Sequence, residues 1–164
     1  EITAAIRSVD EEHVLFLEGA HWANDFTMFD EVFDPQIVFS FHKYWNKNDT
    51  ASIAPYLELR ERLGAPLWNG ETGENTNEWY RECIQLMEDH DIGWSFWTWK
   101  KVDNANCPYT IRKPEYWDEI VAYTDGGERP SVEHARAAFE ELLENIRLER
   151  CVRNDDVLDA IFLR

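Results

Sequence analysis

Basic residues, cysteines and long apolar runs are all scarce in this sequence. Its 16 lysines and arginines are outnumbered by 33 aspartates and glutamates, which gives a formal net charge of −17. Phosphate backbones and anionic headgroups repel so acidic a chain, and we expect neither a nucleic acid nor a membrane as a partner. No apolar stretch approaches the roughly 20 residues of a membrane-spanning helix. The sequence also has no signal-peptide pattern, so the residues themselves do not predict the localisation of the protein.

The chain has three cysteines, Cys83, Cys107 and Cys151, and none of them lies in the Cys-x-x-Cys spacing of a zinc site. No other cluster of metal-binding residue types stands out, so we predict neither a metal nor another cofactor. Cys107 and Cys151 both fall in predicted loops. An internal disulfide between them and a pair of free thiols are both compatible with the sequence.

Aromatic residues, by contrast, are abundant. The 164 residues include eight tryptophans and six tyrosines, and 44% of all residues are hydrophobic, which is enough to build one globular domain. Aromatic rings usually fill a core. Proteins that bind sugars also expose such rings as flat apolar platforms for pyranose faces, so a neutral carbohydrate ligand is open to this acidic chain.

Four short apolar segments recur along the chain. A helical pattern follows the second segment, and another follows the third. The segments are residues 13–17 (HVLFL), 37–41 (IVFSF), 66–68 (PLW) and 93–97 (GWSFW). Their near-continuous apolarity is typical of strands that are covered on both faces, as in a parallel sheet. The alternation of strands and helices therefore predicts an α/β fold.

Capping residues mark two helices between these strands. The first helix is expected to be capped by Asp49 or Thr50 and to stop at Gly64, because these residues flank an apolar stripe. The second opens with Asn75, and Glu78 three residues later completes a capping-box pattern. A long final helix, residues 131–150, follows the fourth strand.

The final helix is expected to be capped by Ser131 and to turn an apolar stripe that includes Phe139 and Leu143 toward the core. At the other end of the chain, residues 1–9 (EITAAIRSV) resemble the last turns of an amphipathic helix that has no cap and no preceding strand to cover.

Four strand-and-helix units make up half of a (β/α)8 barrel. We therefore expect residues 1–164 to form the C-terminal half of such a TIM barrel, strands five to eight, without the N-terminal half. An open half exposes two strand edges and an apolar interior. Its expected partner is the missing N-terminal half-barrel or, for the chain alone, a second copy of itself.

Polar and aromatic residues follow each predicted strand, at the end where the active site of a (β/α)8 barrel lies. In chain order they are Glu18, His21 and Trp22, then His42 and Tyr44, then Glu71, and finally Trp97. Sequence-distant residues that gather at equivalent strand ends are hard to explain by packing alone.

Glu71 lies between Gly70 and Gly73 at the end of a buried segment, a position that favours a catalytic carboxylate over a helix-capping one. His42 and Tyr44 alternate along a strand and so point to one side of it. They are compatible with core packing, but the same spacing can orient a nucleophilic carboxylate and line a sugar site. Hydrogen bonds from a donor such as Tyr44 favour the ionised carboxylate.

Glu18 has two interpretations, and we expect it to hold His21 or Trp22 by hydrogen bonds rather than to act in catalysis. Taken alone, His21 and Trp22 suggest loop packing, and Trp97 could plug a barrel.

The segments FLEGAHWANDF, VFSFHKYW, PLWNGETGEN and GWSFWTWKK, in this order and at these intervals, resemble the second half of the family 5 glycoside hydrolases. These are the retaining enzymes of the cellulase family, built on (β/α)8 barrels, and the resemblance covers about residues 1–150. It implies a secreted or extracellular protein. It also implies a catalytic nucleophile at Glu71, an active-site pair at His42 and Tyr44, and substrate-binding rings at Trp97, beside the cleaved sugar, and Trp22, near the leaving group.

The sequence departs from the family pattern in one respect. Members carry their acid/base glutamate in an Asn-Glu-Pro motif after the fourth strand, and no such triplet occurs here. Retention needs two carboxyl groups about 5–5.5 Å apart. We therefore expect a retaining β-glycoside hydrolase that acts on a β-glucan-type polysaccharide in the manner of an endo-β-1,4-glucanase, and that is inactive as this segment alone.

Two other functions compete with this one. In the first, the half-barrel binds carbohydrate or is merely structural, and Glu71 is inert. In the second, Glu18 acts as an acid and Glu71 as a base, and a wider carboxyl separation of roughly 6.5–9.5 Å inverts the anomeric centre.

Overall fold

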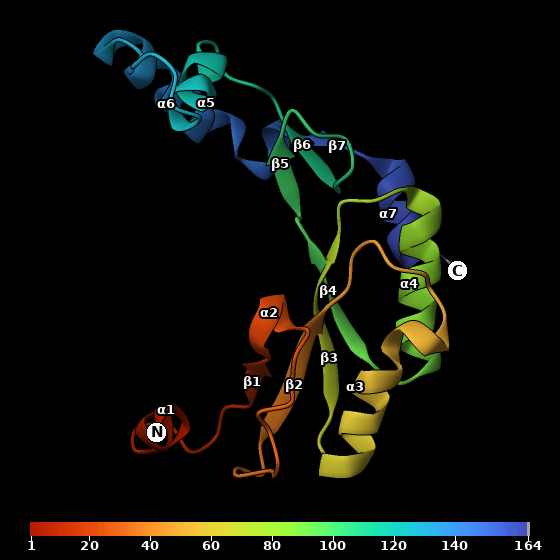
Figure 1. Cartoon of the computed structure of the whole chain (residues 1–164). Coiled ribbons are helices and arrows are strands. Elements are labelled where there is room, and N and C mark those ends of the chain that lie inside the picture. The colour runs from red at the N-terminus through yellow and green to blue at the C-terminus, as the bar shows by residue number, and fades with distance from the viewer. Residues whose placement is uncertain (164) are drawn as a thin grey trace. The chain divides into compact units, whose positions relative to one another are not determined.

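The four predicted strands are present and form one parallel sheet in the order β1-β2-β3-β4 (Figure 1). The α/β class is therefore confirmed. This computed structural model describes residues 1–163 and divides the chain into unit 1, Glu1–Trp97, and unit 2, Thr98–Arg164. The strands of the sheet are β1 (Leu15–Glu18), β2 (Ile37–His42), β3 (Leu67–Gly73) and β4 (Gly93–Trp97).

Unit 1 also contains four helices, α1 (Ile2–Arg7), α2 (Ala20–Ala23), α3 (Thr50–Leu63) and α4 (Asn77–Asp89). The α3 boundaries match the prediction, because the Asp49 side chain accepts a backbone hydrogen bond at 2.9 Å and Gly64 ends the helix in the left-handed conformation. The predicted cap of α4 is wrong by one residue. The Thr76 hydroxyl, rather than Asn75, accepts the capping bond from the backbone of Trp79 at 3.2 Å.

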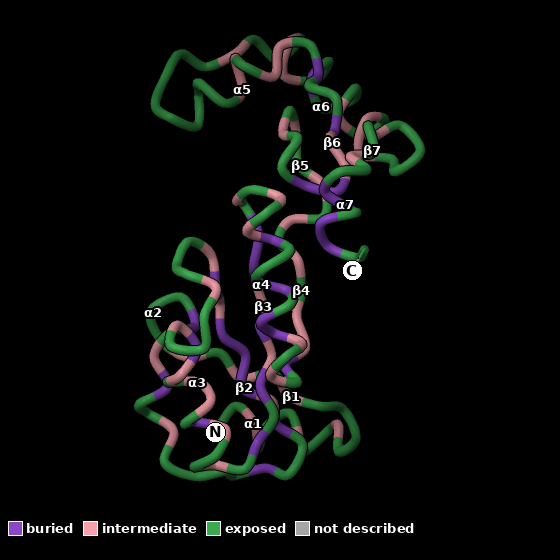
Figure 2. Tube along the Cα trace, turned by 90° about the vertical axis from the view of Figure 1, so that its right-hand side faces the viewer, coloured by how far each residue is buried: buried purple, intermediate pink, exposed green. Residues whose placement is uncertain are grey.

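One face of the sheet packs against α3 and α4, which lie on the same side of it in Figure 1. Phe39 and Phe41 of β2 are fully buried there with Ile53 of α3 and Met87 of α4. Figure 2 colours the buried stretches of β2 and α4 purple. Burying a side chain of this size stabilises the fold by about 1.5–3 kcal/mol. The alternation of strand side chains thus sends the odd-numbered residues of β2 into the core and the even-numbered ones to the opposite face.

The opposite face was expected to be covered within a complete barrel. In this chain it carries apolar side chains that are about half-exposed, Phe16 at 53% and Trp97 at 49%. The rings that lie on it nevertheless contact one another. Phe16 packs edge-on against Trp68 at 5.7 Å between centroids, and the Trp68 indole donates a hydrogen bond to Ser95 at 3.0 Å.

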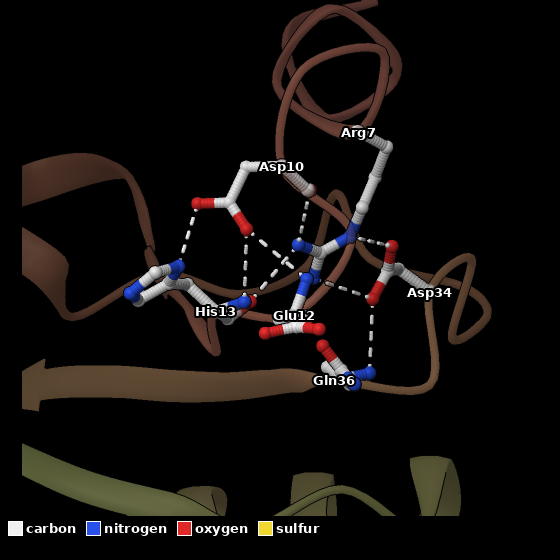
Figure 3. A network of polar contacts seen from close by, with 6 residues as sticks. All are labelled: Arg7, Asp10, Glu12, His13, Asp34 and Gln36. Atoms are coloured by element: carbon white, nitrogen blue, oxygen red, sulfur yellow. Dashed lines mark hydrogen bonds and ion pairs between the residues drawn. The ribbon is translucent and has the colours of Figure 1, made fainter.

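A network of ionic and hydrogen bonds joins α1 to the chain near the N-terminal ends of β1 and β2 (Figure 3). Arg7 makes a two-pronged contact with Asp34, at 2.7 and 3.0 Å, and also donates to the carbonyl oxygen of His13. Asp10 accepts bonds from the backbone and the side chain of His13 and from the backbone of Glu12, which together lower its pKa to about 2.

Unit 2 forms a second, three-stranded sheet in the order β5-β6-β7, in which β5 and β6 are parallel and β6 and β7 antiparallel. Its strands have only two or three residues each, and the sequence pattern did not predict them. The elements are β5 (Lys100–Val102), β6 (Tyr109–Ile111), β7 (Val152–Arg153), α5 (Trp117–Thr124), α6 (Val132–Asn145), the short helix η1 (Leu148–Arg150) and α7 (Asp155–Phe162).

The predicted final helix corresponds to α6. Its Ser131 cap is confirmed, since the hydroxyl accepts from the backbone of His134 at 3.0 Å. The predicted core stripe is wrong in part: Ala138 is fully buried, but Phe139 and Leu143 are exposed at 48% and 64%. An amphipathic pattern identifies an apolar face and cannot say whether this chain itself covers that face.

All three cysteines are free thiols, so Cys107 and Cys151 form the pair of free thiols and not the disulfide. Among residues 1–163, no helix is long and apolar enough to cross a membrane.

Candidate active site

One extra residue in β3 decides where Glu71 points. Phe41 of β2 pairs with Asn69, but the next residue, His42, pairs with Glu71, so Gly70 is inserted relative to β2. Because strand side chains alternate between faces, an inserted residue reverses the alternation beyond it. Asn69 is fully buried on the helix side, and the bulge turns Glu71 to the same side as His42.

The residues around the bulge fit this geometry closely. A β-carbon on Gly70 would lie 2.2 Å from the Ser40 hydroxyl, so a larger residue does not fit without rearrangement. When the Asn69 amide is oriented to satisfy both of its polar atoms, it donates to the carbonyl oxygens of Glu71 and Phe41 at 3.1 and 3.3 Å. Thr72 then faces α4 again and is buried. The bulge is therefore an integral part of β3.

Glu71 and Glu18 lie on opposite sides of the His42 imidazole. The His42 Nδ1 atom is 2.9 Å from Glu71 Oε2, and its Nε2 atom is 3.3 Å from Glu18 Oε1. The His42 side chain is largely buried at 17% exposure, whereas Glu71 is 26% and Glu18 60% exposed. A ring nitrogen that carries a proton donates to the carboxylate that it faces, and contacts on both sides hold the ring with Nδ1 toward Glu71.

Tyr44 completes the contacts to Glu71. Burial and then the negative charge of the neighbouring Glu71 carboxylate raise the pKa of Tyr44 well above its usual range. The phenol therefore keeps its proton and remains a donor. His42 thus contacts the Glu71 carboxylate directly, Tyr44 lies beside it as a protonated phenol, and the carboxylate is partly open to solvent.

Trp97 lies at the same end of the sheet, paired with Gly73 of β3. It shares a face with His42, because Trp94 and Phe96 of β4 pack toward the helices and Trp97 alternates with them. A β-carbon on Gly73 would lie 1.7 Å from the carbonyl oxygen of Trp97. The close approach of the two backbones at this pair therefore requires glycine.

Trp22 lies in a strained turn after β1. Three successive residues, His21, Trp22 and Ala23, have positive φ angles of 50°, 55° and 60°, which is rare outside glycine. Asn24 donates to the carbonyl oxygens of His21 and Trp22 at 3.2 and 2.9 Å and is itself held by Tyr56 at 2.7 Å. The turn leaves the Trp22 side chain 86% exposed. Strain of this kind concentrates at functional sites.

The structure thus brings His42 and Tyr44 onto Glu71, and it puts Trp97 and Trp22 at C-terminal ends of strands of the same sheet. The expected role of Glu18 is corrected: its carboxylate meets His42 instead of His21 or Trp22, because parallel pairing sets Glu18 beside Ser40, two residues before His42. Sequence reasoning did not single out Trp45, although its position directly after Tyr44 was a signal. Within residues 1–163, no group of three or more metal-binding side chains could hold a metal ion.

Chemically, this arrangement places a partly exposed carboxylate between an imidazole and a protonated phenol. Such a group can attack an electron-poor carbon and then leave again, because these two neighbours stabilise it when it is released. Exposed indoles at the same end of the sheet offer flat apolar surface to a ligand.

Parts of the chain are similar to known proteins. A 58-residue stretch is 34% identical to Endoglucanase C of Acetivibrio thermocellus and covers 31% of this chain and 17% of that protein. The match to Endoglucanase C307 of a Clostridium species has the same identity and coverage. The crystal structure of the clostridial cellulose synthase subunit Z from Clostridioides difficile superposes with a TM-score of 0.58, at 13% identity, over 98% of this chain and 54% of that one.

The structural likeness, at so low an identity, shows the shared fold alone. The chain spans about half of the length of that structure and less than a fifth of the endoglucanases. The family model described as cellulase (glycosyl hydrolase family 5) matches residues 1–103, which is more than half of the chain and includes β1 to β4. This protein therefore belongs to glycosyl hydrolase family 5.

Proposed function

We propose that this chain carries the nucleophile of a retaining β-glycoside hydrolase that cleaves a β-glucan-type polysaccharide, as an endo-β-1,4-glucanase does. The single observation that carries the proposal is the geometry of Glu71, turned by the bulge onto His42 and Tyr44 at the C-terminal end of a parallel sheet. Membership of the cellulase family and the likeness to endoglucanases support the choice of substrate.

The reaction proceeds in two displacements. In the first, a Glu71 carboxylate oxygen bonds to the anomeric carbon while the bond to the leaving sugar oxygen breaks and an acid protonates that oxygen. In the second, water loses a proton to the same acid/base residue and displaces Glu71 from the anomeric carbon. Each displacement inverts this carbon, so its configuration is retained overall. Trp97 and Trp22 supply apolar faces for the sugar rings.

The acid/base residue belongs, in this proposal, to a complementing half-barrel, with β1 to β4 as strands five to eight. An open groove of about 1030 Å³ beside β1 supports this idea. Its lining is mainly apolar and includes Ile2, Ile6, Val14, Phe16 and Phe33. A further strand that pairs with β1 would bury these side chains, and a second copy of the chain is the alternative occupant.

Replacing Glu71 with glutamine tests the proposal in the natural protein that carries these 164 residues. Turnover of a β-glucan and of an aryl β-cellobioside should fall by several orders of magnitude, because the amide cannot act as the nucleophile. Glu78→Gln, which changes an exposed carboxylate in the first turn of α4, is the matched control. Near-normal hydrolysis by Glu71→Gln would refute the proposal.

Covalent trapping separates the enzyme from a non-catalytic carbohydrate-binding half-barrel. An activated 2-fluoro sugar should leave its glycosyl group esterified to Glu71 as its leaving group departs, and mass spectrometry should find the added mass on the peptide that contains Glu71. NMR of the first-formed product should show retention. Inversion would instead support the pair of Glu18 as acid and Glu71 as base.

A further inference from the structure

Trp45 is an exposed aromatic residue that directly follows the site residues of β2. Its side chain is 77% exposed, although tryptophan is among the residue types that usually lie largely buried. Its ring lies against that of Tyr44, with 5.4 Å between centroids and 34° between planes. Tyr44 in turn neighbours the Glu71 carboxylate, so Glu71, Tyr44 and Trp45 follow one another outward from the carboxylate.

A buried lysine, Lys43, holds the turn that carries Trp45. Lys43 is only 2% exposed, and its ammonium donates to the Asn46 side chain at 2.6 Å and to the carbonyl oxygen of Lys47 at 2.7 Å. Its backbone also donates to the carbonyl oxygen of Glu71 at 3.0 Å. Burial lowers the pKa of Lys43, and the ammonium is compensated by these oxygens.

Helix α4 holds the same turn from a second side. The Trp79 indole donates to the carbonyl oxygen of Asn46 at 3.1 Å, and its ring lies under the Lys43 ammonium, 5.4 Å from the ring centroid. Asn48 donates to the carbonyl oxygen of Trp79 at 3.1 Å. Residues on both sides of Trp45 are thus fixed, and the exposed ring is carried by an ordered backbone.

We propose that Trp45 is a stacking platform for a sugar ring that lies beyond the two rings joined by the cleaved linkage, and that Lys43 positions it. This inference rests on the proposed function, because the ligand is taken to be a chain of β-linked sugars. The Trp45 ring extends the Tyr44 surface by one aromatic ring, which suits a substrate that continues beyond the cleaved linkage. An ordered platform binds at a smaller entropic cost than a mobile one.

The central experiment measures kcat and KM of Trp45→Ala on a length series of β-1,4-gluco-oligosaccharides, using the natural protein that carries this chain. For long substrates KM should rise about tenfold while kcat changes little, and for the shortest cleaved substrate neither should change. Trp45→Phe should keep most of the affinity because it keeps a ring. Tyr123→Ala, which removes an aromatic ring that is 48% exposed on α5, is the control.

The role of Lys43 is tested by a double-mutant cycle. Lys43→Met should raise KM for long substrates in the presence of Trp45 and should add little to KM in the Trp45→Ala background, since it acts through that ring. Additive effects of the two substitutions on KM would show that Lys43 does not position Trp45. If Lys43→Met does not fold, Lys43→Arg replaces it in the same cycle.

Binding to the Glu71→Gln variant distinguishes a failure of this inference from a failure of the proposed function. Calorimetry with cellohexaose should give a dissociation constant about tenfold weaker when Trp45→Ala is added. An unchanged affinity, or an equal loss for short and long substrates, overturns the platform even if Glu71 is the nucleophile. Normal turnover by Glu71→Gln refutes the proposed function, and this binding experiment then still decides whether Trp45 holds a sugar.

Discussion

The two ends of the parallel sheet in unit 1 differ in whether their polar and aromatic side chains are paired or open to solvent. At the N-terminal ends of β1 and β2, charged groups are paired with one another: Arg7 with Asp34, and Asp10 with His13. At the C-terminal ends, His42 and Tyr44 lie beside Glu71, and the tryptophans nearby are open to solvent.

The backbone differs between the two ends as well. The C-terminal end contains the bulge at Gly70, the close approach at Gly73 and the strained turn at Trp22. In (β/α)8 enzymes the C-terminal end of the sheet carries catalysis and the N-terminal end carries stability. One sheet therefore uses the same residue types for both purposes, and the purpose depends on whether their partners leave them any free surface.

The largest effect is expected from Gly73→Ala, which would break the C-terminal end alone. The new β-carbon would meet the Trp97 carbonyl oxygen at 1.7 Å, so the β3–β4 pair must separate. Urea unfolding should show a loss of about 3 kcal/mol. Gly64→Ala, where nothing lies within 4 Å and only the left-handed conformation opposes alanine, should lose about 1 kcal/mol. Equal losses would contradict the steric argument.

Tyr44→Phe should reduce kcat about a hundredfold and leave the fold intact, because it removes the phenol hydroxyl beside Glu71. The ring contact with Trp45 is kept, so KM for long substrates should change little. Steady-state kinetics on an aryl β-cellobioside provide the measurement, and circular dichroism provides the control for folding. A kcat within twofold of the parent would show that the phenol does not assist Glu71.

Glu18→Gln should have a smaller effect, a two- to fivefold reduction in kcat, because the Glu18 carboxylate is exposed and its contact with His42 is correspondingly weak. It tests whether Glu18 orients His42 or acts as a catalytic acid. Glu11→Gln, an exposed carboxylate near the N-terminal end of β1, serves as the control. A loss comparable to that of Glu71→Gln would make Glu18 a catalytic group.

The charged residues at the N-terminal end of the sheet should make the stability of the fold depend on pH. The pKa of Asp10 is lowered from 3.8 to about 2, so its contribution to stability is fully present above about pH 4 and is lost as the pH falls toward 2. Thermal unfolding midpoints between pH 5 and 2 should therefore fall less steeply for Asp10→Asn than for the parent. Identical slopes would show that Asp10 contributes nothing. Activity at neutral pH should be unchanged by this substitution.

The sequence predicted the elements whose signals are local. Apolar runs identified all four strands of the first sheet, and Asp49 with Gly64 bounded α3 because capping depends on only a few neighbouring residues. The same local rules chose Asn75 instead of its neighbour Thr76 as the cap of α4, which is wrong by one residue. They also missed the strands of unit 2, which are too short to carry a periodic pattern.

Which of these side chains contact one another depends on the tertiary structure. The resemblance carried by four strand-end motifs pointed to Glu71, His42 and Tyr44, and parallel strands in register bring such ends together. No local pattern states that Glu18 meets His42, or that a bulge reverses the direction of Glu71, because both depend on the pairing of one strand with its neighbour.

The sequence alone predicted the four strands of the first sheet and helices α3, α4 and α6, and it named Glu71, His42 and Tyr44 as candidates for the chemistry. These predictions follow from side-chain types and from spacing along one segment. The direction of Glu71, the two carboxylates on one imidazole and the ordered turn beneath Trp45 were decided only when β1, β2, β3 and α4 packed together. Those features depend on distances between atoms that are far apart in the chain, and only the folded backbone fixes them.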